Sequence, residues 1–99
     1  MSFVVTNPQT LTAAAGNMED IGLTMAANNA AAAAPTTGVV PAAADPVSAL
    51  TAAQFASYAE MYQAISAQAA AIHELVVATL GSNACAYAAA EAANAITAR

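Results

Sequence analysis

The stretch that decides the fold is residues 46–81, PVSALTAAQFASYAEMYQAISAQAAAIHELVVATLG. Asp45 precedes it and Pro46 begins it, and together they form a helix start. The Asp side chain caps free amide groups, and Pro at the first helical position loses no hydrogen bond by lacking a donor. Alanine, the best helix former, makes up a third of the chain. We therefore predict one long helix over residues 46–81.

Large apolar side chains cover one broad side of this predicted helix. They sweep an arc of roughly 160° when each residue turns the helix by about 100°, and Glu60 and Glu74 lie on the opposite side. One neighbouring helix covers only part of such an arc, and exposed apolar strips of that size mark an interface. The residues of the arc are Val47, Leu50, Phe55, Tyr58, Met61, Tyr62, Ile65, Ile72, Leu75, Val76 and Leu80.

A second capped start, Asn7-Pro8, predicts another helix over about residues 8–36. Residues 35–41, PTTGVVP, form the connection, because Pro disfavours a continuing helix and Gly38 can supply a left-handed stop. Two helices joined by so short a loop lie antiparallel. The apolar face of the first helix consists of Leu11, Ala14 or Ala15, Met18, Ile21, Met25 and Ala32.

Polar residues interrupt both predicted helices. Asn28 and Asn29 break the apolar face of the first helix; we interpret them as solvated surface, the alternative being a buried amide that fixes the register. Residues 81–83, Gly-Ser-Asn, predict the end of the second helix, so the tail forms a short, weaker helix at most. The predicted fold is all-α: a long antiparallel two-helix hairpin over residues 1–84 that completes a four-helix bundle with a partner protein, then a tail over residues 85–99.

The charge balance excludes several classes of function. The sequence has six acidic residues and a single cation, Arg99, which gives a formal net charge of -5. Nucleic acid binding is excluded because it needs clustered Lys or Arg. The N-terminus lacks the positive region of a cleavable signal peptide. The uncharged residues 21–44 are too rich in Ala, Asn, Thr and Pro to predict a transmembrane helix.

The sequence offers no catalytic or metal-binding constellation. His73 is its only imidazole and Cys85 its only thiol, which excludes an intrachain disulfide and a Cys-based metal site. Glu60 and Glu74 would lie about 21 Å apart along a helix, too far for paired acid and base chemistry. We interpret His73 and Glu74 as an ordinary helix edge. The prediction is a protein that is no enzyme and binds no cofactor or metal.

Three long segments resemble the PE family of mycobacteria. They are residues 1–8 (MSFVVTNP), 29–50 (NAAAAAPTTGVVPAAADPVSAL) and 51–74 (TAAQFASYAEMYQAISAQAAAIHE). The resemblance covers essentially the whole chain. The family is named for a Pro-Glu near its N-terminus, where this chain has Pro8-Gln9. The change removes a first-turn carboxylate, whose interaction with the helix dipole would stabilise the helix by about 0.3–1 kcal/mol.

This resemblance implies a partner and an export route. It implies a 1:1 heterodimer with a PPE-family protein, a four-helix interface, and export by the type VII secretion machinery, with chaperone contact through the PPE partner only. The family's export signal, Tyr-x-x-x-Asp/Glu after the second helix, matches Tyr87 to Glu91. We predict the partner interface at Leu50, Phe55, Tyr58, Met61, Tyr62, Ile65, Ile72, Val76 and Leu80, with Leu11, Met18, Ile21 and Met25.

The resemblance is to short family members exported by the fifth type VII system, and the sequence ends at Arg99 without the long domains of other members. The expected location is secreted, or associated with the cell surface or outer membrane, without a cleavable signal peptide. The alternative function is a component of a PE/PPE outer-membrane assembly for small-solute transport.

Overall fold

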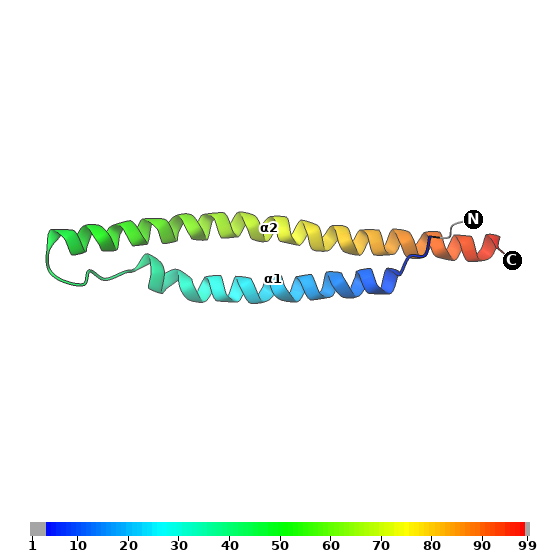
Figure 1. Cartoon of the computed structure of the whole chain (residues 1–99), viewed down its shortest axis with the longest axis horizontal. Coiled ribbons are helices and arrows are strands. Elements are labelled where there is room, and N and C mark those ends of the chain that lie inside the picture. The colour runs from blue at the N-terminus through cyan, green and yellow to red at the C-terminus, as the bar shows by residue number, and fades with distance from the viewer. Residues whose placement is uncertain (1–3, 99) are drawn as a thin grey trace. The chain divides into compact units, whose positions relative to one another are not determined.

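The computed structural model describes residues 4–98, which form two helices, α1 (Pro8–Thr37) and α2 (Pro46–Thr97), joined by residues 38–45 (Figure 1). The described residues contain no strand, so the all-α prediction is confirmed. Met1 to Phe3, in the first of the matching segments, and Arg99, the single cation, lie outside the described residues.

Both helices begin where the capping residues predict. The backbone N–H of Thr10 donates to Asn7 Oδ1 (3.1 Å), and that of Ser48 donates to Asp45 Oδ1 (2.9 Å). The Ser48 hydroxyl also donates to Asp45 Oδ2 (2.9 Å). The bonds from the Ser48 amide and hydroxyl hold the pKa of Asp45 below its usual value, since they favour the charged carboxylate. The cap of α2 is therefore ionised at neutral pH.

Helix α1 ends at Thr37, one residue past the predicted end, by a different device from the predicted one. No glycine among the described residues has a positive φ, so the predicted left-handed stop at Gly38 is wrong. At the end of the helix the Gly38 backbone N–H donates to the Ala34 carbonyl (3.0 Å), and two hydroxyl groups of the last turn bond back to carbonyls one turn earlier. Thr36 Oγ1 donates to the carbonyl of Ala32 (2.6 Å), and Thr37 Oγ1 donates to that of Ala33 (2.7 Å).

Helix α2 continues past residues 81–83 to Thr97, so the predicted helix end at Gly81 is wrong. One glycine costs a helix about 1 kcal/mol relative to alanine, which the alanine-rich residues 84–98 outweigh. The division into a hairpin over residues 1–84 and a secretion-signal tail over residues 85–99 is a statement about function, and it stays a prediction.

Replacing the glycine inside α2 is expected to stabilise the protein. A Cβ built on Gly81 meets no atom within 4 Å, so Gly81→Ala removes the propensity cost without a clash and should raise the free energy of unfolding by about 1 kcal/mol. Urea denaturation followed by circular dichroism measures the change. Gly38→Ala is the matched control, because its Cβ would lie 3.0 Å from the Ala34 carbonyl and no gain is expected. A destabilised Gly81→Ala variant would contradict an unbroken α2.

The chain divides into two compact units, and each contains parts of both helices. Unit 1 joins Met1–Ile21 to His73–Arg99. In it, the Thr6 hydroxyl donates to Glu91 Oε1 (2.9 Å), and His73 Nε2–H donates to the Met18 carbonyl. Residue numbers rise along one segment as they fall along the other, so the helices of unit 1 are antiparallel.

Unit 2 is Gly22–Ile72 and contains the rest of α1, the connection, and the first half of α2. The Tyr62 hydroxyl donates to Asn29 Oδ1 (2.7 Å), and Gln63 Nε2 donates to the Asn29 carbonyl (3.0 Å). These bonds join the two arms on either side of the connection. Unit 2 is thus a helical hairpin, as predicted.

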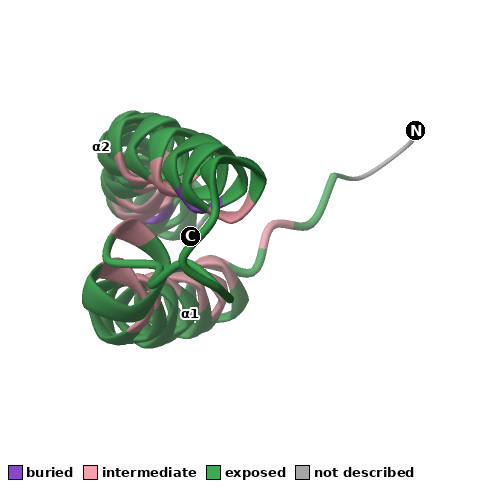
Figure 2. Ribbon diagram, turned by 90° about the vertical axis from the view of Figure 1, so that its left-hand side faces the viewer, coloured by how far each residue is buried: buried purple, intermediate pink, exposed green. Residues whose placement is uncertain are grey.

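The contact between the helices is built from small and polar side chains. Ala15, Ala52 and Ala84 are the only buried residues in the described part of the chain. The half-buried and buried stretches of the two helices lie on the sides that face each other (Figure 2). On α2 these residues recur at spacings of three, four or seven, as in a coiled-coil seam. We call this series the inner seam: Ala52, Ala56, Ala59, Gln63, Ser66, His73, Val77, Leu80 and Ala84.

Candidate protein-binding surface

A second series of residues runs along α2 one position before the inner seam. Its members are apolar and exposed, with Phe55 at 62%, Tyr58 at 58% and Ile65 at 64% of their full accessible area. The prediction that α1 leaves aromatic residues of α2 in water is therefore confirmed. We call this series the outer seam: Phe55, Tyr58, Tyr62, Ile65, Ala69, Ile72 and Val76.

The angle between the two seams follows from helix geometry. A shift of one residue turns an α-helix by about 100°, so the outer seam lies about a right angle from the side that contacts α1. Each large apolar side chain left in water forgoes about 1.5–3 kcal/mol relative to full burial. Helix α2 thus carries one occupied seam and one unoccupied apolar seam beside it.

Helix α1 covers less of the apolar arc than the sequence predicts. Of the arc residues only Leu80 is half-buried, and all the others are exposed. The reason is the composition of the inner seam. Small side chains such as Ala52 and Ala59 allow the helix backbones to approach closely, so α1 lies against the flank of the arc rather than on its centre.

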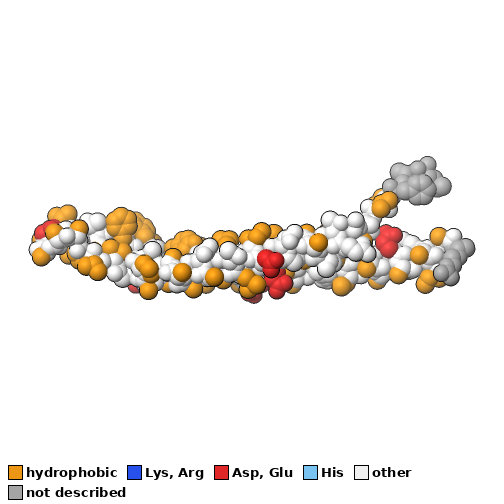
Figure 3. All heavy atoms as spheres, turned by 90° about the horizontal axis from the view of Figure 1, so that it is seen from below, with side chains coloured by type: hydrophobic (Ala, Val, Ile, Leu, Met, Phe, Trp, Pro, Cys, Tyr) orange, Lys and Arg blue, Asp and Glu red, His pale blue; other side chains and the backbone are white. Residues whose placement is uncertain are grey.

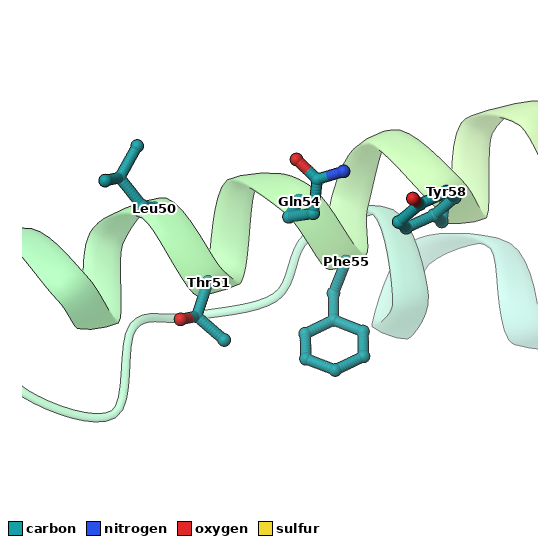
Figure 4. A pocket seen from close by; sticks show the side chains of 5 residues that line it. All are labelled: Leu50, Thr51, Gln54, Phe55 and Tyr58. Carbon is teal, nitrogen blue, oxygen red and sulfur yellow. The ribbon is translucent and has the colours of Figure 1, made fainter.

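Two adjoining hollows lie beside the outer seam within unit 2. One, of about 390 Å³, is lined by Leu50, Thr51, Gln54, Phe55 and Tyr58. In Figure 4 the Phe55 ring stands clear of the α2 ribbon, and Leu50 extends to the other side of the helix. The other, of about 500 Å³, lies between the helices, and we call it the interhelical groove. It is lined by Asn29, Ala32, Pro35, Thr36, Val39, Phe55, Tyr58, Ala59 and Tyr62.

One wall of the interhelical groove is tied across to α1. The Tyr62 ring belongs to α2, and its hydroxyl reaches Asn29 Oδ1 at 2.7 Å. The neighbouring Gln63 side chain donates to the Asn29 backbone carbonyl at 3.0 Å. Asn29, on α1, therefore accepts hydrogen bonds from two side chains of α2, one through its side-chain oxygen and one through its backbone carbonyl. Its neighbour Asn28 is exposed, as the sequence predicts for both residues.

The predicted interface residues divide by exposure into two groups. Three of them lie half-buried at the contact of the helices: Leu11, Met18 and Leu80. The other ten are exposed: Ile21 and Met25 on α1, and Leu50, Phe55, Tyr58, Met61, Tyr62, Ile65, Ile72 and Val76 on α2. Six of these α2 residues belong to the outer seam, and Leu50 and Met61 lie beyond it on the side away from α1.

The described surface carries acids and no Lys or Arg. No member of the outer seam or of the interhelical groove is charged, and Glu60 and Glu74 lie on the other side of the inner seam. Figure 3 shows apolar side chains spread over one face, interrupted by small acidic patches. No three His, Cys, Asp or Glu side chains gather as metal ligands in residues 4–98. The outer seam suits an uncharged, apolar counterpart.

The two residues that match the export signal lie near the end of α2. Tyr87 is 46% exposed and Glu91 is exposed one helical turn later, so both side chains lie on the same side of the helix. The Thr6 hydroxyl donates to Glu91. Residues 84–97 present this pair on a regular helix rather than on an irregular tail.

Three residues that bond across the helices were not identified from the sequence: His73, Asn29, and Gln63, which donates to the Asn29 carbonyl. His73, interpreted as a helix edge, is half-buried and donates to the Met18 carbonyl. Asn29, interpreted as solvated surface, is half-buried and bonded to Tyr62. The available signal was spacing: Asn29 follows Ala15 by two heptads, and His73 follows Ala52 by three.

Comparison with known proteins gives consistent matches. The PE family model matches residues 4–94. The chain is 64% identical over 98 residues to PE family protein PE13 of Mycobacterium tuberculosis, covering 99% of each protein. It is 54% identical over 94 residues to PE8 and 57% identical over 95 residues to PE_PGRS33 of the same species. It spans only 34% of PE8 and 19% of PE_PGRS33.

These matches assign the family and no catalytic activity. PE13 matches over nearly its whole length, and the two longer relatives match over 95% and 96% of this chain. Because the family model and all three relatives cover nearly every residue, the chain belongs to the PE family.

Proposed function

We propose that this chain is a non-enzymatic, secreted protein whose α2 packs against a PPE-family protein in a 1:1 heterodimer. The pair forms a four-helix bundle in which α1 and α2 supply two helices and the partner supplies two. The chain also carries the export signal of the pair, Tyr87 and Glu91, which the type VII secretion machinery reads. Family chaperones contact the PPE partner and not this chain.

The observation that supports the bundle is the unoccupied outer seam. In a square arrangement of four helices, each helix touches two neighbours about a right angle apart. Helix α2 has α1 on one seam and an apolar, uncharged seam about a right angle away. Two partner helices complete the square and bury residues such as Phe55 and Ile65.

Light scattering tests the assembly. The chain is purified alone and together with candidate PPE-family proteins, and the molar mass of each sample is measured. We expect one PPE-family protein to give a 1:1 complex, and the chain alone to self-associate or lose helix on dilution. A stable, fully helical monomer that no PPE-family protein binds would contradict the proposal. A homodimer that no PPE-family protein binds would indicate a bundle of two copies instead.

A second candidate function is a component of a PE/PPE outer-membrane assembly for small-solute transport. The observation in its favour is α2, which is long and apolar enough to cross a membrane, by length and composition alone, and whose most apolar window is not buried. Solute conductance by the purified pair in reconstituted bilayers, with the export machinery absent, separates this function from the first.

A further inference from the structure

The interhelical groove has the geometry of a coiled-coil hole. Phe55, Tyr58, Ala59 and Tyr62 all line it, and they occupy positions i, i+3, i+4 and i+7 of α2. Four residues at these positions form the hole that receives one side chain, the knob, from a facing helix. Three members are aromatic walls, and the fourth, Ala59, leaves room at the floor.

The side chains that line the interhelical groove indicate which kind of group can fill the hole. None of its lining residues is charged, and the charged residues of unit 2 are the carboxylates of Asp45 and Glu60, neither of which lines it. An anionic headgroup finds no cation there, and a cationic side chain finds no carboxylate. A bulky uncharged apolar side chain meets three aromatic walls and gains contact with each.

One wall of the hole is fixed before any partner arrives. The Tyr62 hydroxyl donates to Asn29 Oδ1 at 2.7 Å, although the Tyr62 side chain is 52% exposed. An exposed aromatic ring otherwise samples several rotamers, and ordering it on binding costs affinity. The bond to Asn29 removes that cost in advance, since it links the ring to the opposite helix.

We propose that the Phe55, Tyr58, Ala59 and Tyr62 hole is a preformed socket for one large uncharged apolar side chain on a helix of the partner, and that Asn29 is its positioning residue. This inference rests on the proposed heterodimer and names the anchor point within it. Asn29 acts through Tyr62 and need not touch the partner itself.

A double-mutant cycle tests the positioning role. The dissociation constant is measured by isothermal titration calorimetry for the PPE-family protein that co-purifies with the wild-type chain. Asn29→Ala and Tyr62→Phe each remove the bond and should weaken binding about three- to tenfold. The double variant should be about as weak as either single one, because both changes remove the same interaction.

Asn28→Ala is the matched control. It makes the same chemical change one residue away, at an exposed position, and gains the same helix propensity. Asn29→Ala also keeps the backbone carbonyl that accepts from Gln63. Circular dichroism should show equal helix content for both variants, while only Asn29→Ala binds more weakly. A purely structural role predicts parallel losses in helix content and binding, and that result would overturn the inference.

Photo-crosslinking tests the occupant. p-Benzoylphenylalanine in place of Phe55 should crosslink to a large apolar residue within a helix of the PPE-family protein. Crosslinks only to a second copy of the chain, to lipid, or to a charged loop of the partner would overturn the socket. A wild-type chain that binds no PPE-family protein overturns the heterodimer and this inference together. Normal wild-type binding with equal affinities for Asn28→Ala and Asn29→Ala overturns this inference alone.

Discussion

Ile65→Asp and Tyr58→Asp should each abolish heterodimer formation while leaving the helix content of the free chain equal to that of the wild type. Both side chains belong to the outer seam and are more than half exposed in the chain alone, so a carboxylate there stays hydrated. In the complex the same carboxylate would be buried without a partner, at a cost of at least about 3 kcal/mol, or more than a hundredfold in dissociation constant. Calorimetric titration with the PPE-family protein measures the loss, and circular dichroism checks the fold.

Glu74→Ala is the control for this pair of variants. Glu74 lies on the other side of the inner seam from Ile65 and Tyr58, so its removal should change the affinity little. If all three variants bind as tightly as the wild-type chain, the outer seam is not the interface. Equal failure of all three would point to a general effect of substitution on the helix.

Tyr87→Ala should block export and leave the heterodimer intact. Tyr87 is one helical turn before Glu91 and lies outside the outer seam, whose last member is Val76. The substitution removes an aromatic ring from the proposed signal without touching the proposed interface. Immunoblots of culture filtrate and cell lysate measure the extracellular fraction, which should fall below detection. Co-purification should recover the variant with its PPE-family partner in normal yield.

Ile96→Ala provides the comparison for the export experiment. Ile96 is also a large exposed side chain near the end of α2, but it is not part of the Tyr-x-x-x-Glu pattern. Its extracellular amount should match that of the wild type. Normal export of the Tyr87→Ala variant would remove the assignment of Tyr87 and Glu91 as the signal.

Local signals placed the starts of both helices correctly. Asn7-Pro8 and Asp45-Pro46 act through atoms within three residues of each cap, so the sequence contains all the information needed. The helix ends were less predictable. Gly81 is an adequate stop signal by itself, yet the alanine-rich residues after it sustain α2 through Thr97.

The partition of the apolar arc was harder to predict because it depends on how the helices pack. The sequence shows a wide arc on α2 but not which flank faces α1. The flank that faces α1 consists of small and polar residues, among them Ala59, Gln63 and His73. A search for large apolar side chains passes over such residues. The bonds of Asn29 and His73 join residues 33 and 55 positions apart, and no local pattern reports them. The exposed aromatic residues, by contrast, followed directly from the width of the arc.

Hydroxyl-radical footprinting of the chain, alone and in complex with its PPE-family partner, most directly tests whether a second protein covers the outer seam. The labelling of Phe55, Tyr58 and Tyr62 is compared between the two samples, with Tyr87 as an internal reference outside the seam. Our account predicts strong protection of the three seam residues in the complex and unchanged labelling of Tyr87. Equal labelling of Phe55, Tyr58 and Tyr62 in both samples would contradict it.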